Sequence, residues 1–286
     1  MQFQIGATGV NANEWIQPTI CTFKNQFHCF YGELGSGRIK HVRSSDGIHW
    51  DVAHQTNVGD SRGRPSCSIV FWGQMHVFYR HGRGEILHIR TTDGETWDTP
   101  YNIGWATEDR SGASVASLDD SFVLVYRNYQ GDGIMYSKFT GGWKHGNTGH
   151  TSRAPRPGIV AYGGRYHLFY KDGGDNGHNR GIMHAFSNDG ETWMGATPFH
   201  VSNTETSASP IAVGYGAKLH LFYRDARGNA IFHAASVNGF EFEPAAPFNI
   251  GLDLYDGPST AVLDNTLCLI GVEANGSKVM RAVHKP

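Results

Sequence analysis

Short apolar strands recur at regular intervals along this chain. The sequence His-x-Phe-Tyr, set within an apolar run, occurs complete or worn in six places, which end at Tyr31, Tyr79, Tyr126, Tyr170, Tyr223 and Gly271. Each is preceded by an anchor residue at Pro18, Pro65, Ala113, Pro157, Pro210 or Pro258, so the repeat length lies between 44 and 53 residues. Polar and apolar positions alternate with a period of two, which predicts strands and no helices.

Each repeat continues in the same order after this run. A third strand carries a histidine in four repeats, namely His41, His88, His184 and His233, and has Tyr136 or Arg281 in the other two. A turn of the form Ser/Thr-x-Asp-Gly-x-x-Trp follows at 44–50, 91–97 and 187–193, with a degenerate copy at 236–242. A short strand such as Tyr101–Gly104 ends the unit. We therefore predict four strands per repeat.

The two ends of the chain indicate how the repeats are arranged. The sixth repeat has only three strands before Pro286, and Phe3–Gly6 resembles the closing strand Phe248–Gly251. A repeat split between the termini is expected if repeats close into a ring, and four-stranded units in a ring form a β-propeller. An open β-sandwich does not explain the split. We predict one all-β domain, 1–286, a six-bladed β-propeller with blades at 18–59, 65–104, 113–146, 157–202, 210–251, and 258–286 plus 1–6.

Composition excludes several function classes. The chain has 37 Gly, 17% charged residues and a net charge of −2, so it offers no basic surface typical of nucleic-acid binding. No apolar run reaches the length of a membrane helix, and the N-terminus shows no secretory signal. These features predict no nucleic-acid partner, no membrane insertion, and a location that is cytoplasmic or reached by a non-signal route.

Four cysteines, Cys21, Cys29, Cys67 and Cys268, are too few and too scattered for a disulfide framework or a zinc ribbon. Cys21 and Cys29 flank a predicted hairpin turn and could face each other. Reduced thiols that line the core are the favoured interpretation.

The repeated turn and histidines have a structural interpretation. In the turn, Asp caps backbone N–H groups, Gly supplies a positive φ and Trp folds back onto the blade. The loop around Gly82 brings His76 near His88, and His220 similarly meets His233. Two histidines do not complete a metal site, which needs three or four ligands, so hydrogen-bonded pairs are favoured and no metal or other cofactor is expected.

A recurring cation provides the candidate binding site. It follows the Phe-Tyr run directly in four repeats, as Tyr79-Arg80, Tyr126-Arg127, Tyr170-Lys171 and Tyr223-Arg224. A Tyr ring stacks on the C–H face of a sugar, and a cation donates to its hydroxyls. Trp15 and Trp105 in the blade linkers join this candidate set. An equally weighted alternative is a structural hydrogen bond from each cation to a carbonyl of the neighbouring blade.

The repeat resembles a known family. Its Phe-Tyr-Arg run, apolar-x-His strand, Gly-x-x-Trp turn and closing Ile-Gly are similar to the repeats of bacterial β-propeller lectins typified by the Photorhabdus lectins. Those lectins have seven blades, whereas six are counted here; six-bladed fucose-binding lectins share the blade count but not these motifs. The resemblance implies several sugar pockets between adjacent blades, with glycans as partners and oligomers possible.

An enzymatic family is the main alternative. The Asp-Gly turns, and Tyr166–Trp193 as a whole, resemble the Asp boxes and blades of sialidases and arabinanase-like propeller glycosidases. Such enzymes need two carboxylates around the central channel, for which Glu14, Asp60, Asp109, Glu205 and Asp256 are candidates. Arg64 and Arg156 precede their blades, but a third arginine for a sialidase triad is missing there. A multivalent lectin without catalytic residues therefore ranks first, a glycoside hydrolase second and a protein-binding scaffold third.

Overall fold

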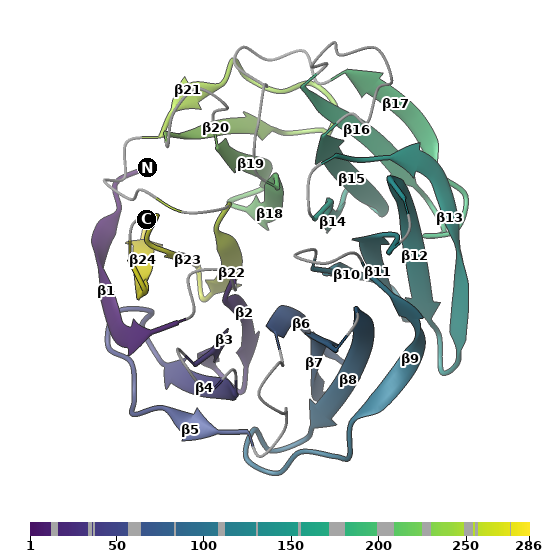
Figure 1. Ribbon diagram of the computed structural model, residues 1–286. Helices are drawn as coiled ribbons and strands as arrows, with labels where there is room; N and C mark the ends of the chain where they lie inside the picture. The colour runs from purple at the N-terminus through teal and green to yellow at the C-terminus, as the bar shows by residue number, and fades with distance from the viewer. Residues whose placement is uncertain are drawn as a thin grey trace. The chain divides into compact units, whose positions relative to one another are not determined.

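The described part of the chain forms six four-stranded antiparallel sheets, which are the blades of a six-bladed β-propeller (Figure 1). The computed structural model describes residues 1–12, 17–33, 36, 38–56, 64–82, 84–107, 112–129, 131–153, 156–171, 181–198, 209–224, 230–248, 254, 257–274 and 276–286. We call the four successive strands of a blade A, B, C and D. The chain divides into two compact units, Met1–Ala106 with Ile250–Pro286, and Thr107–Asn249.

The first unit contains blades six, one and two. Blade six comprises β22 (Ser259–Leu263), β23 (Thr266–Val272), β24 (Lys278–His284) and β1 (Gln4–Asn11). Blade one comprises β2 (Thr19–Phe23), β3 (Gln26–Gly32), β4 (Ile39–Ser44) and β5 (His54–Gln55). Blade two comprises β6 (Arg64–Phe71), β7 (Gln74–His81), β8 (Glu85–Thr91) and β9 (Tyr101–Ala106).

The second unit contains blades three, four and five. Blade three comprises β10 (Ser114–Leu118), β11 (Ser121–Arg127), β12 (Gly133–Phe139) and β13 (Trp143–Thr151). Blade four comprises β14 (Gly158–Tyr162), β15 (Arg165–Lys171), β16 (Ile182–Ser187) and β17 (Met194–Pro198). Blade five comprises β18 (Ile211–Tyr215), β19 (Lys218–Arg224), β20 (Ile231–Ser236) and β21 (Ala246–Pro247).

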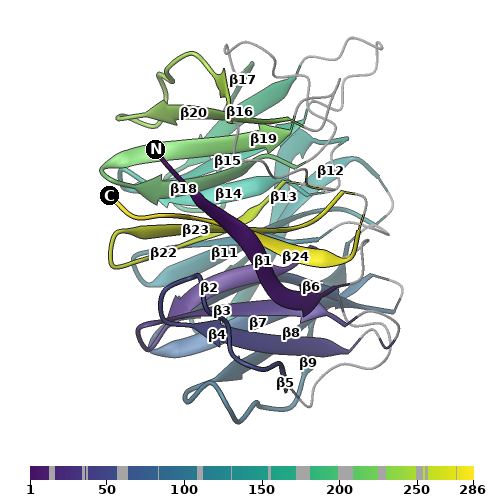
Figure 2. The same ribbon diagram turned by 90° about the vertical axis from the view of Figure 1, so that its left-hand side faces the viewer.

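The N-terminal strand completes the last blade, as predicted. β1 pairs antiparallel with β24, placing Ile5 opposite Ala282, and Figure 2 shows the purple N-terminal strand alongside the yellow C-terminal one. Thr8 Oγ1 also donates to the carbonyl of Val279 at 3.0 Å. The first and last parts of the sequence are therefore held together by a strand ladder.

Apolar layers between successive blades of each unit form the core. In the first unit, Phe27 and Cys29 of blade one pack with Ile270 of blade six, and Phe30 packs with Met75 of blade two. In the second unit, Leu168 packs between blades three and four. The B strands are covered on both faces, which explains why they are almost continuously apolar instead of alternating.

Some boundaries differ from the prediction. β13 continues to Thr151, past the predicted end of blade three at 146, and the closing strand of blade five begins at Ala246, before the expected Phe248. The four cysteines are buried thiols that form no disulfide with one another, as favoured; Cys21 lies opposite His28, and Cys29 opposite Ile20. The described residues include no helix with the length and apolar character needed to cross a bilayer.

Candidate functional site

The recurring cation occupies one equivalent position in four blades. It is the residue of the B strand that pairs with the first isoleucine of the C strand, giving Arg80 with Ile86, Arg127 with Ile134, Lys171 with Ile182, and Arg224 with Ile231. Gly32 and Val272 hold this position in blades one and six. The cations therefore recur at the blade edge where the B strands end, which we call the B-strand edge.

The tyrosines before these cations are buried. Their exposed fractions are 1% for Tyr79, 0% for Tyr126, 3% for Tyr170 and 0% for Tyr223. Rings this buried offer no open face to a sugar, which corrects the stacking role expected for these four tyrosines. Tyr126 exemplifies the structural role, since its hydroxyl bonds the Ser137 hydroxyl at 3.0 Å and burial raises the pKa of the phenol.

The cations are partly to fully buried. Arg80 is only 5% exposed, whereas Arg127, Lys171 and Arg224 are half-buried. Arg127 pairs with Asp132 of its own blade, with an Nη2 to Oδ1 distance of 2.8 Å. That carboxylate has a 44% exposed side chain, so the ion pair borders on solvent. A half-buried ion pair of this kind presents both a hydrogen-bond donor and an acceptor to a polar ligand.

Blades three and four bring several polar groups together at this edge. His150 at the end of β13 stacks on Tyr170, with ring centroids 5.5 Å apart. The N–H of Ser152 donates to the carbonyl of Asp132, and the N–H of Arg153 donates to that of Lys171. Burial lowers the pKa of His150, so its imidazole favours the neutral form. Sequence reasoning missed His150 because only the long strand β13 carries it to Tyr170.

Several candidates fall outside the described residues. They are Trp15, with Glu14, Asp60, Asp109, Glu205 and Asp256 of the enzymatic alternative. Trp105 lies in β9 and Arg64 in β6, but only their backbones are described. Arg156 is buried, and its N–H donates to the Ser209 hydroxyl at 3.1 Å. All five carboxylates nominated for a hydrolase therefore lie outside the part of the chain that the structure describes.

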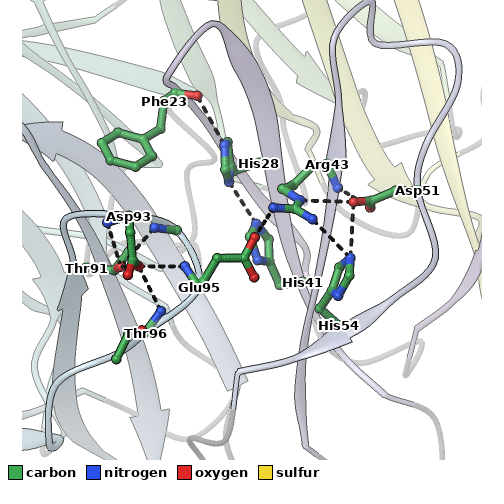
Figure 3. Close-up of polar contacts among 11 residues, drawn as sticks. Phe23, His28, His41, Arg43, Asp51, His54, Thr91, Asp93, Glu95 and Thr96 are labelled. Carbon is green, nitrogen blue, oxygen red and sulfur yellow. Dashed lines mark hydrogen bonds and ion pairs between the residues drawn. The ribbon is translucent and has the colours of Figure 1, made fainter.

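The Asp-Gly turns lie at the opposite end of the blades and have the predicted local roles. In blade two, Asp93 Oδ1 accepts from the N–H groups of Glu95 and Thr96 at 2.8 Å, and Thr91 Oγ1 accepts from Gly94 (Figure 3). Equivalent bonds occur in blades one, four and five. Although burial opposes it, the N–H groups of Thr192 and Glu191 lower the pKa of Asp189 to about 2.

These turns also contact the preceding blade. Trp97 packs edge-on against Phe30 and His41 of blade one, with ring centroids 5.6 and 6.2 Å away. Arg43 of blade one forms an ion pair with Glu95 of blade two, as Figure 3 shows. The turn therefore stabilises the contact between two blades, which its sequence pattern did not reveal.

The predicted histidine pairs are present. His76 Nδ1 lies 2.9 Å from His88 Nε2, and His220 Nδ1 lies 2.8 Å from His233 Nε2. Within the described residues, His, Cys, Asp and Glu form no group of three or more that could hold a metal ion.

Comparison with known proteins finds similarity at the level of the fold. Neither a protein-family model nor a curated protein matches the chain. Solved structures of fungal and bacterial β-propeller lectins and of sialidases share its fold. One structure of the Aleuria aurantia lectin is described as a six-bladed β-propeller with a novel mode of fucose recognition.

Three of these structures show the extent of the similarity. An Aleuria aurantia lectin in complex with Fucα1-6GlcNAc matches with a TM-score of 0.73 and 14% identity, over 95% of this chain and 92% of the lectin. A Burkholderia pseudomallei lectin matches with a TM-score of 0.68 and 15% identity, over 94% and 81%. A Hadza microbial sialidase matches with a TM-score of 0.67 and 18% identity, over 93% and 64%.

Proposed function

We propose that the chain is a multivalent carbohydrate-binding lectin with sugar sites between blades at the B-strand edge. The repeated cation carries this proposal. Folding explains the buried Tyr and Ile of each copy, whereas the cation places a charged hydrogen-bond donor at one register position in four blades. At Arg127 this donor forms an ion pair with the 44% exposed Asp132 side chain, which suits a polar ligand. The recurrence therefore favours a shared ligand-binding role. The fold held in common with lectins and the motif resemblance to the Photorhabdus lectins support the same proposal.

The chemistry of this edge suits glycans. Guanidinium and ammonium groups donate hydrogen bonds to hydroxyl oxygens, and Asp132 supplies an exposed acceptor beside Arg127. Since the tyrosine rings are buried, Trp15 and Trp105 stay as the proposed partners for stacking on a sugar; the first lies outside the described residues, and only the backbone of the second is described. Between blades three and four, Lys171 and His150 would contact the same sugar as the Arg127–Asp132 pair.

The number of sites follows from the register. Blades two to five keep the cation, whereas blades one and six have Gly32 and Val272 there, so we expect fewer than six sites. Weak single sites on one chain give high avidity on a surface that bears many glycans. Association of several chains would raise that avidity further.

The stoichiometry of glycan binding tests the proposal. A glycan-array screen first identifies a ligand, and calorimetry then counts sites in the wild type and in Arg224→Ala. We expect this variant to lose about one site and to agglutinate less strongly. Lys218→Ala is the matched control, because Lys218 begins the same strand, β19, and pairs with Glu243. If replacing each of the four cations by Ala leaves the number of bound glycans unchanged, the assignment of the sites is wrong.

A glycoside hydrolase is the second candidate, favoured by the structural similarity to sialidases. It predicts one ligand per chain, release of free sugar, and dependence on a carboxylate such as Asp109 or Glu205. Incubation with a sialylated or arabinan substrate, followed by measurement of released sugar, separates the two functions.

A further inference from the structure

Among the described residues, four blades contain a histidine pair with nearly the same geometry. The B-strand Nδ1 lies 2.8 to 3.0 Å from the C-strand Nε2 in the pairs His28–His41, His76–His88, His167–His184 and His220–His233. The two rings of each pair are stacked, with interplanar angles between 9° and 21°. This arrangement is therefore a repeated element of the fold.

The bonding partners determine where the protons lie. His28 Nε2 is 3.1 Å from the carbonyl of Phe23, and His167 Nε2 is 3.2 Å from that of Tyr162. A carbonyl only accepts, so each of these nitrogens carries a hydrogen, and Nδ1 of the neutral ring must accept. The C-strand histidine then donates from Nε2. In these two pairs the bond between the rings therefore requires a neutral B-strand imidazole, with tautomers assigned from this network.

Two of these pairs lie at joints between consecutive blades of one unit. At the joint of blades one and two, a Cβ added to Gly94 would lie 3.5 Å from His28, and Trp97 packs against His41. At the joint of blades four and five, a Cβ on Gly239 would lie 2.6 Å from His167, and Phe240 contacts both rings. We call these two contacts the histidine joints.

Burial makes a charge at these joints costly. The four histidines are between 1% and 6% exposed, and burial lowers the pKa of His28 to about 4 and of His41 and His184 to about 3. His167 shifts in the same direction. The charged and titratable groups that act on the first joint are Arg43, Asp51, His54 and Glu95; on the second, Arg165 acts on His167. The acids at the first joint do not outweigh burial.

Other joints use different residues at the same place. Between blades three and four, Gly190 packs against Val123, and between blades six and one, Gly47 packs against Cys268. The turn glycine of one blade thus approaches the B strand of the preceding blade closely even where that strand has no histidine. The pairs add a titratable element to a contact that forms without one.

We propose that the histidine joints are an acid-sensitive latch that holds consecutive blades together at neutral pH and opens as the pH falls. Protonation of the B-strand ring at Nδ1 would place two N–H groups face to face, and protonation of either ring would leave a buried cation against Trp or Phe. Unfolded histidines bind protons near pH 6.5, whereas in the folded chain His28, His41 and His184 have a pKa of about 3 to 4 and that of His167 is lowered in the same direction. The stability that the joints contribute is therefore complete above pH 6.5 and falls below it. If the proposed lectin function holds, glycans bound between these blades are released in acid.

Proton uptake on unfolding, measured without glycan, tests the latch. At pH 5.5 an unfolded histidine carries about 0.9 proton, so the four joint histidines should contribute up to about four protons to the uptake when the wild type unfolds in urea. The pairs His76–His88 and His220–His233 add to that total, because burial also lowers the pKa of His76, His88 and His233. At pH 7.5 the uptake should nearly vanish. Fewer than one proton at pH 5.5 would overturn the proposal.

A variant locates the effect at one joint. His167→Val with His184→Phe replaces a pair by apolar residues, with Val taken from the equivalent position Val123. We expect the uptake at pH 5.5 to fall by up to two protons. A folded double variant with wild-type uptake would overturn the latch; if the variant does not fold, the wild-type measurement decides. Absence of glycan binding at pH 7.5 would contradict only the proposed lectin function.

Discussion

Substitution of Gly239 by Ala should destabilise the protein more than substitution of turn glycines whose added Cβ has room, such as Gly163 and Gly94. Gly239 has a φ of +80°, and an added Cβ would lie 2.6 Å from Cε1 and 3.0 Å from Nε2 of His167. His167 is 1% exposed and is held by bonds to His184 and to the Tyr162 carbonyl, so its ring cannot move aside. Backbone strain and a steric clash therefore combine at this position.

The two contributions have different magnitudes and separate controls. A left-handed backbone costs Ala about 1–2 kcal/mol relative to Gly. Overpacking of a buried contact adds about 1–3 kcal/mol. Gly163 has a φ of +56° and nothing within 4 Å of an added Cβ, so Gly163→Ala should show only the backbone cost. Gly94→Ala should behave similarly, because its Cβ would meet His28 at an ordinary 3.5 Å.

Urea-induced unfolding of the three variants at pH 7.5 measures these differences. We expect Gly239→Ala to lose about 1–3 kcal/mol more than the other two variants, at an unchanged denaturant slope. Glycan binding should persist in the folded fraction, because the turn is at the opposite blade end from the B-strand edge. If Gly239→Ala and Gly163→Ala lose the same free energy of unfolding, the inference that contact with His167 of the adjacent blade adds a steric cost at Gly239 is refuted.

The remaining predictions concern the ends of the chain and the thiols. Deletion of Met1–Gly6 should remove pairing partners of β24, lower the melting temperature and cause aggregation through the exposed edge; a monodisperse truncation that melts like the full chain contradicts this. Cys29 and Cys268 are fully buried, and burial raises the pKa of both thiols, that of Cys268 to about 12. Both should therefore resist alkylation at pH 8 until urea unfolds the chain. Rapid labelling of the folded protein would contradict their burial.

Repetition made most of the fold predictable. The anchors from Pro18 to Pro258 and the period-two pattern predicted six blades, and Phe3–Gly6 predicted the strand that β1 forms beside β24. The Asp-Gly turns were equally predictable, because capping by Asp93 and the positive φ of Gly94 depend only on neighbouring residues. Boundaries were less accurate where strand length depends on neighbours, as for β13.

The sequence by itself determined the blades, their order and the equivalent position of the cation in blades two to five, since each follows from local alternation and spacing. Contacts between blades were decided only by the tertiary structure. Tyr170 and Lys171 are adjacent in sequence, yet the ring is enclosed by neighbouring blades while the ammonium group is half-buried at an edge. His150 meets Tyr170, and Gly239 meets His167, across sheets whose residues are far apart in the chain. Burial and packing between sheets depend on which surfaces meet, and a pattern within one strand does not contain that information.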